Sequence, residues 1–236
     1  MDIRGDWVSS DTDLYYSLEE TISDVKSNFD FRRYKSAEGS SSKIDDVTTQ
    51  VIVQSHLNPL NRDKIDNIIH MPIETLVQTG SIVDFENEKW IIVSDIDDLK
   101  AYKSANMVKS NNTLLFYPSQ SNENPISNDL IEIPCIVGKG NINLDTNKFL
   151  SIPADENLII CPNNSNSSYI NENTRFILSG SAYVVQGIDN ISNVGLLNIR
   201  VKQDQISADD NLELGISNYW SNQSDVPIDL GDVWLK

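Results

Sequence analysis

Residues 80–94 read Gly-Ser-Ile-Val-Asp-Phe-Glu-Asn-Glu-Lys-Trp-Ile-Ile-Val-Ser, and this stretch decides the fold class. It contains two short runs rich in β-branched and aromatic residues, Ile82–Phe85 and Lys89–Ser94, separated by a few polar residues. Apolar and polar positions partly alternate within the runs, and such runs are typical of β-strands. The segment therefore predicts a β-hairpin that carries an aromatic residue, Trp90.

A second segment has the same order of features. The runs Arg175–Leu178 and Ala182–Gln186 predict another hairpin with an aromatic residue, Tyr183. In both segments an Ile-Asp pair follows the hairpin, and a further apolar strand comes after a polar excursion, at Thr113–Phe116 and at Leu196–Ile199. Self-similarity of this kind indicates a structural unit that is used twice. We predict a mainly β protein of two tandem small β-barrel or β-sandwich domains.

The boundary between the two domains is expected in a polar, proline-containing stretch. Further strands are predicted on either side of it, at Thr48–Gln54 before it and at Ile131–Val137 and Leu158–Cys161 after it. The stretch Pro118–Asn128 lacks the apolar residues that would continue the pattern. Placing the boundary near Gln120 gives a first β domain over residues 44–120 and a second over residues 121–206.

The N-terminal residues 1–43 have a different pattern. Apolar residues at positions 14, 18, 22, 25 and 29 are spaced by three or four, which places them on one face of a helix. The residues Ser36–Ser42 that follow are small and polar, and they predict a flexible connection. We expect one amphipathic helix whose apolar face packs against its own domain or against another protein.

The C-terminal residues 207–236 read as an arm. They begin with a turn cluster, Asp209-Asp210-Asn211, and later offer an unusual amount of apolar area among acidic residues. Such a terminal segment tends to dock on a partner, although folding back on its own domain is an equally good alternative. The residues expected at a subunit or partner interface are Val226, Ile228, Leu230, Val233, Trp234 and Leu235.

Composition and charge exclude some functions. The chain has 236 residues, of which 39% are hydrophobic and 22% charged, so it has enough apolar residues to build cores. Its formal net charge of −17 would repel a phosphate backbone, so wrapping of duplex DNA is disfavoured. An acidic surface would still suit a channel through which DNA slides without sticking. Neither a membrane-spanning run nor a secretory signal is present, so a product of the cytoplasm is expected.

Residues for catalysis or metal binding are not grouped in any recognisable pattern. His56 and His70 occur in unlike local sequences, and no Gly-x-Ser-x-Gly motif is present. Cys135 and Cys161 lie in apolar runs without a Cys-x-x-Cys spacing, which favours two buried thiols over a disulfide. We therefore expect no enzymatic activity, no catalytic residues, no cofactor and no metal.

The segment Gly80–Phe116 resembles structural proteins of tailed phages that infect low-GC Gram-positive bacteria. In that group a Gly-x-x-Val strand leads through a polar turn to a Trp-centred strand, an Asp-containing loop and a final strand. The corresponding residues are Gly80-Ser81-Ile82-Val83, Lys89–Val93, Asp95–Asp98 and Ala101–Leu115. Asn111 matches the Asn of a Cys-Asn pair that is common in that group, and Ser110 replaces the Cys. Arg175-Phe176, Tyr183-Val184-Val185 and Gly195-Leu196-Leu197 look like its second half.

The resemblance implies a role in closing the phage head and connecting it to the tail. The expected protein is a cyclic homo-oligomer of the neck, with a portal or adaptor protein on the head side and a tail terminator or tail tube protein on the tail side. It would be made in the bacterial host cytoplasm and reside in the virion. The alternatives are a tail or baseplate component, and a carbohydrate-binding β module, although Trp7, Trp90, Trp220 and Trp234 are too dispersed for a sugar-binding cluster.

Overall fold

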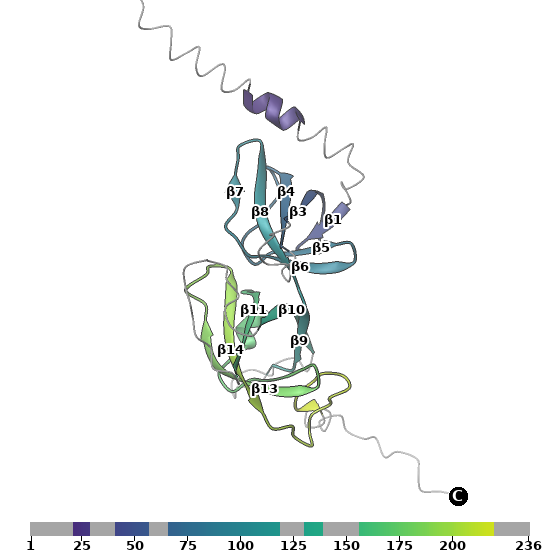
Figure 1. Cartoon of the computed structure of the whole chain (residues 1–236), viewed down its shortest axis with the longest axis vertical. Coiled ribbons are helices and arrows are strands. Elements are labelled where there is room, and N and C mark those ends of the chain that lie inside the picture. The colour runs from purple at the N-terminus through teal and green to yellow at the C-terminus, as the bar shows by residue number, and fades with distance from the viewer. Residues whose placement is uncertain (1–20, 29–40, 57–65, 119–129, 139–155, 220–236) are drawn as a thin grey trace, which may run out of the picture. The chain divides into compact units, whose positions relative to one another are not determined.

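The computed structural model describes residues 21–28, 41–56, 66–118, 130–138 and 156–219, and it divides the chain into two compact units between Lys109 and Ser110. Each unit contains one antiparallel sheet that curves into a nearly closed barrel (Figure 1). The predicted mainly β fold with two tandem β domains is thereby confirmed. Helix is found at residues 21–28, inside the segment where the apolar spacing predicts it.

The first barrel closes through one bent strand. Its sheet has the order β2-β1-β5-β6-β8-β4-β3, with β7 attached to β8. The strands β2 and β3 stand at opposite ends of this order, yet only Val51 separates them in the chain, so together they connect the two edges of the sheet. The elements are β1 (Ser41–Ile44), β2 (Val47–Gln50), β3 (Ile52–His56), β4 (Asp66–Pro72), β5 (Ile82–Phe85), β6 (Glu88–Ile92), β7 (Asp97–Asp98) and β8 (Tyr102–Lys109).

The second barrel has an open seam. Its sheet has the order β12-β13-β14-β11-β10-β9. The end strands β9 and β12 lie side by side, but no ladder of backbone hydrogen bonds joins them in the described structure. The elements are β9 (Asn112–Phe116), β10 (Ile131–Gly138), β11 (Glu156–Pro162), the 3₁₀ helix η1 (Ser167–Tyr169), β12 (Arg175–Leu178), β13 (Ser181–Asp189) and β14 (Leu196–Asp204).

The two barrels follow the same chain path. Strands β1, β4, β5, β6 and β8 of the first correspond to β9, β11, β12, β13 and β14 of the second. The bent strand β2–β3 corresponds to β10, whose first residues pair with β9 and whose last residues pair with β11. In both barrels the third and fourth strands of this path, β4 and β5 in the first and β11 and β12 in the second, are not neighbours in the sheet. This shared connectivity supports the internal repeat that the sequence indicates.

The correspondence extends to individual residues. Strand β4 reads Asp-Asn-Ile-Ile-His-Met-Pro and β11 reads Glu-Asn-Leu-Ile-Ile-Cys-Pro. The register of β4 against β8 is the same as that of β11 against β14. The buried Asn67 lies opposite Met107 of β8, and the buried Asn157 lies opposite Val201 of β14. Both strands end in proline, which cannot donate a ladder hydrogen bond and so suits a strand end.

Two-residue turns set the register of both predicted hairpins. Glu86 and Asn87 between β5 and β6 have φ of 54° and 63°, and Ser179 and Gly180 between β12 and β13 have φ of 49° and 76°. Two successive positive φ values are the signature of a type I′ turn, whose twist matches that of paired strands. Consequently Val83 lies opposite Trp90 and Phe176 lies opposite Tyr183.

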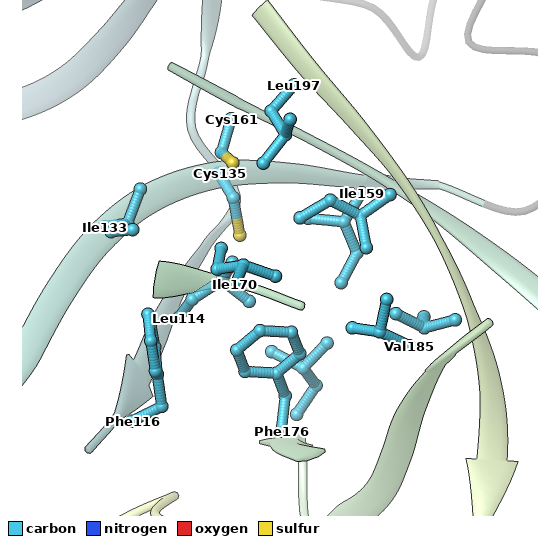
Figure 2. Packing of buried hydrophobic residues seen from close by; sticks show 13 residues of the cluster. Leu114, Phe116, Ile133, Cys135, Ile159, Cys161, Ile170, Phe176, Val185 and Leu197 are labelled. Carbon is cyan, nitrogen blue, oxygen red and sulfur yellow. The ribbon is translucent and has the colours of Figure 1, made fainter. Parts of the chain in front are cut away.

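Each barrel has its own apolar core. The first contains Trp90, which is 4% exposed and contacts Phe85 edge to face. The second is built from residues of its six strands and of the connection that includes η1, and Figure 2 shows Phe116 and Phe176 on one side of it and the two cysteines on another. The buried residues of the second core are Leu114, Phe116, Ile133, Cys135, Ile159, Cys161, Ile170, Phe176, Leu178, Val185, Leu197, Ile199 and Val201.

The boundary between the units lies upstream of the position near Gln120 that the polar stretch indicates. The run Thr113–Phe116, interpreted as the last strand of the first repeat, instead forms β9 and pairs with Ile131–Cys135 of the second sheet. Strand β8 takes its place in the first barrel and pairs with β6. Two apolar strands joined by a polar loop are compatible with either barrel, so only the long-range pairing decides between them.

Four strands of the first barrel, β1, β4, β7 and β8, are not among the strands that the sequence predicts. Strand β1 begins at Ser41, inside the stretch Ser36–Ser42 that was interpreted as a flexible connection, and Ser42 is buried. Strands β4 and β8 contain His, Lys, Asn or Pro among their apolar residues, which obscures the strand pattern. β4 and β8 are each flanked by two other strands in the sheet, so their backbone groups can form ladders on both sides.

The described part of the N-terminal helix is only partly covered. Ile22 is half-buried, Val25 is exposed, and Lys26 Nζ lies 3.3 Å from Glu74 Oε1 in the connection after β4. The other residues of the predicted apolar face, at positions 14, 18 and 29, lie outside the described residues. The expected packing of that face therefore stays a prediction.

Candidate functional site

Arg175, the first residue of β12, binds two carboxylates. Its Nε donates to Asp204 Oδ2 at 2.8 Å, and its two terminal nitrogens donate to the two oxygens of Asp210 at 3.0 Å each. One terminal nitrogen also donates to the carbonyl of Gln205 at 2.7 Å. A guanidinium that binds a carboxylate through two parallel hydrogen bonds is held in one orientation. We call this group, Arg175 with Asp204 and Asp210, the clasp.

The clasp is buried at its centre. The Asp210 side chain is 0% exposed and accepts further hydrogen bonds from the backbone N–H groups of Ser207 and Asn218. Burial by itself raises the pKa of the Asp210 carboxyl, but those two N–H groups and Arg175 outweigh it and hold this pKa below its ordinary value. The carboxylate is therefore charged whenever the barrel is folded near neutral pH.

The clasp attaches the chain after β14 to the outer edge of β12. Ser217 Oγ donates to the carbonyl of Arg175 at 2.6 Å, and Gly215 lies beside the carbonyl of Ile177. Ile216 is buried, and it also forms a bridge with Asn211. The residues from 207 to 219, predicted as the start of an arm, are thus an ordered part of the second domain. The predicted interface residues Val226, Ile228, Leu230, Val233, Trp234 and Leu235 lie outside the described residues.

A small cleft lies beside the clasp. Its volume is about 220 Å³, below the ~300–1,000 Å³ usual for small-molecule sites. The last residues of β9, the turn before β12 and the clasped segment form its walls, and the lining residues are Phe116, Tyr117, Asn171, Glu172, Asn173, Thr174, Arg175, Ser217 and Asn218. The clasped segment therefore ends at the same end of the barrel at which β12 begins.

Two loops lie at that end of the second barrel, and we call them together the loop face: residues 163–174 between β11 and β12, and residues 189–195, which run from the last residue of β13 to the start of β14. They lie together because Pro162 pairs with Leu196 and because Asn163 N–H donates to the carbonyl of Gly195 at 2.9 Å. Ile191 and Val194 are each 85% exposed at the tip of the second loop. The loop face thus presents two apolar side chains to solvent.

The exposed apolar tip is held in shape by hydrogen bonds. Asp189 Oδ1 accepts from the backbone N–H groups of Ile191 and Ser192, both at 2.9 Å, and Leu196 N–H donates to the carbonyl of Asn193. The neighbouring loop is similarly braced, since Asn164 Oδ1 accepts from two backbone N–H groups within it. Rigid apolar groups on a surface are typical of protein-docking sites.

Of the histidine and cysteine residues considered in the sequence, the structure describes the side chains of His70, Cys135 and Cys161, and these three are not brought together in one site. His70 is half-buried and meets Tyr102 edge to face at 5.4 Å, and burial lowers its pKa. Cys135 and Cys161 are free and buried, as expected from their apolar runs. Burial raises the pKa of Cys161 to about 12. Among the described residues, no group of three or more His, Cys, Asp or Glu is placed to hold a metal ion.

The pairing of Arg175 with Asp210 is not apparent from the sequence. The turn cluster Asp209-Asp210-Asn211 was recognised, but Asp210 is a buried anchor in addition to a turn residue. The only signal was a single arginine at the head of an otherwise apolar run, Arg175–Leu178. A charge in that position needs a partner if it is to be buried, but the partner lies 35 residues away in the chain.

The fold and the site together define a protein of two β-barrels with the same strand connectivity, whose second barrel anchors residues 207–219. Residues 13–109 match the model of the YomX N-terminal domain, and residues 89–202 match that of the YomX C-terminal domain. The chain carries both domains and belongs to the YomX family, which is phage-derived, so this is a phage protein. No curated protein and no solved structure matches the chain. Within the described residues, no helix has the length and apolarity needed to cross a membrane.

Proposed function

We propose that this protein is a structural component of the phage particle, and that it forms part of the neck ring that closes the head and connects it to the tail. It acts by binding other proteins and not by catalysis. One observation supports this most strongly: the Arg175 clasp anchors the start of an apolar C-terminal arm at the face where Ile191 and Val194 are exposed. A chain with both an anchored arm and exposed apolar side chains has two surfaces that can each bind a neighbouring protein.

The repeated barrel also suits a connecting layer. A closed ring requires heterologous surfaces, so that one side of a subunit meets a different side of the next. Two barrels with the same chain path but different connections offer such unlike surfaces on one chain. The proposed neighbours are a portal or adaptor protein on the head side and a tail terminator or tail tube protein on the tail side.

The net charge of −17 fits a ring through which DNA passes. Carboxylates that face the channel would repel the phosphate backbone, so the DNA would not bind to the channel wall. The same charge would disfavour a role in packaging DNA by wrapping it. A tail or baseplate component is the second candidate, since it would use the same kinds of protein contact.

The test is a phage in which the gene is interrupted, examined by electron microscopy of the lysate. We expect DNA-filled or leaking heads and complete tails that are not joined, with joining restored by the gene supplied in trans. Joined particles with malformed tail tips would instead identify a tail or baseplate component. Normal infectious particles that lack the protein would overturn a structural role altogether.

A further inference from the structure

We propose that the loop face of the second barrel binds the C-terminal arm, Val226–Leu235, of a second copy of this chain. The inference rests on the proposed function in one respect, because it names the contact by which subunits of the ring meet. The loop face consists of residues 163–174 and 189–195, with Ile191 and Val194 at its tip.

The backbone of the loop face is already held by hydrogen bonds in the free chain. Ile191 and Val194 are 85% exposed, yet the backbone between them is fixed by the Asp189 carboxylate and by the hydrogen bond between Leu196 and Asn193. Ordering a mobile loop on binding would cost free energy, and a loop that is already ordered avoids that cost. Burying two aliphatic side chains that start almost fully exposed gives the contact its driving force.

The charge of the chain restricts where two copies can approach each other. Each copy carries a formal net charge of −17, so most surfaces of two copies repel. The loop face has only two charged residues, Glu172 and Asp189, and Asp189 is already hydrogen-bonded to its own loop. Its other residues are mainly Asn and Ser, with one Tyr. Depletion of charge is typical of the core of a protein interface, and in antibody paratopes Asn and Ser side chains supply adaptable hydrogen bonds.

The arm is the occupant because it starts at the same face. Ser217 and Asn218 line the cleft next to the turn Asn171–Thr174, which belongs to the loop face. Six residues separate Tyr219 from Val226 in the sequence, so the two Cα atoms lie at most about 25 Å apart. Val226, Ile228 and Leu230 then alternate with other residues, so an extended arm presents its apolar side chains on one side. An arm that extends away from its own barrel can therefore reach the loop face of the next subunit, which is a contact between unlike surfaces, as a closed ring requires.

The experiment uses disulfide formation between two full-length chains. One chain carries Val194→Cys and the other carries Leu230→Cys, on the apolar side of the arm, and the native Cys135 and Cys161 stay in place because they are buried. The chains are mixed, oxidised mildly and resolved by mass under non-reducing conditions. We expect a mixed dimer to form at least tenfold faster than with the matched control Val47→Cys, an exposed valine of the first barrel.

Three results would overturn the inference. The first is equal rates for Val194→Cys and for the Val47→Cys control. The second is exclusive formation of an intramolecular disulfide when Val194→Cys and Leu230→Cys are placed on the same chain, because the arm would then dock on its own barrel. The third is unchanged self-association of an Ile191→Ser, Val194→Ser double variant in sedimentation, with an unchanged thermal melt as proof of folding.

These results separate the inference from the proposed function. If the cross-link fails while the gene interruption still yields unjoined heads and tails, the neck assignment stands and the arm contact is wrong. If the cross-link forms while particles assemble normally without the protein, the contact stands and the neck assignment is wrong.

Discussion

Phe116 and Phe176 meet edge to face across the open seam of the second barrel, with ring centroids 5.5 Å apart and an interplanar angle of 83°. At the corresponding positions of the first barrel, Ile44 and Val83 are directly paired in the ladder between β1 and β5. Two phenyl rings occupy more space than an isoleucine and a valine. The aromatic pair therefore fills the seam from inside, and β9 and β12 stay side by side without a backbone ladder.

Because the second barrel has an open seam, Phe176 should contribute more to the stability of the second barrel than Val83 contributes to that of the first. Phe176→Ala should lower the free energy of unfolding of the second barrel by about 3 to 5 kcal/mol, because it removes a buried ring where no ladder compensates. Val83→Ala removes less volume beside an intact ladder and should cost about half as much. Denaturant titrations followed by far-ultraviolet circular dichroism measure both. Equal costs would show that the ring pair does not hold the seam.

Trp90 should be a core anchor of the first barrel. It is 4% exposed and packs against Phe85, so Trp90→Ala should cost about 3 to 5 kcal/mol through lost burial and a cavity. Its Nε1 has no hydrogen-bond partner within the described structure, so Trp90→Phe should be much milder. The midpoint of urea unfolding decides this. A loss under about 1 kcal/mol for Trp90→Ala would contradict the position of the ring in the core.

Breaking the clasp should be costly because one charge would stay buried. Arg175→Met removes the partner of the buried Asp210 carboxylate and should destabilise the second barrel by about 3 to 5 kcal/mol. Lys89→Met breaks an exposed pair with Asp84 and should cost at most about 1 kcal/mol. Hydrogen exchange measured by mass spectrometry should show faster exchange around residues 205–218 in Arg175→Met only. Unchanged exchange there would mean that other contacts hold the segment.

The second barrel should lose stability in acid through Asp210. The folded pKa of this carboxyl is depressed, so its contribution to stability is fully present above the unfolded value of about 3.9 and is lost as the pH falls through the folded pKa. The free energy of unfolding should therefore decline below about pH 4. The decline should be shallower in Asp210→Asn, which has no proton to bind at that position. The same slope in both proteins would assign the acid sensitivity to other carboxylates.

Cys135 and Cys161 should resist thiol reagents while the second barrel is folded. Burial raises the pKa of both thiols, that of Cys161 to about 12, so neither is ionised near neutral pH. Reaction with an aromatic disulfide reagent at pH 8 should be negligible in the native protein and should reach two thiols per chain in denaturant. Rapid native labelling would show that the core opens locally or that the thiols are accessible.

The sequence by itself determined the fold class and the repeat. The spacing of β-branched and aromatic residues around Trp90 and Tyr183 predicts two hairpins, because side chains that alternate between a core and solvent leave a period of two in the sequence. The two buried thiols are predicted for the same reason, since Cys135 and Cys161 lie within apolar runs. These features depend only on residues close together in the chain.

The tertiary structure alone decided which strands share a sheet and where a charge is buried. Thr113–Phe116 looks like a strand of either barrel, and it belongs to the second because it pairs with Ile131–Cys135. Arg175 meets Asp210 only once β12, β14 and the chain beyond have folded together. Pairings between distant residues depend on the whole path of the chain, because each local pattern is satisfied by several partners and only mutual packing selects one.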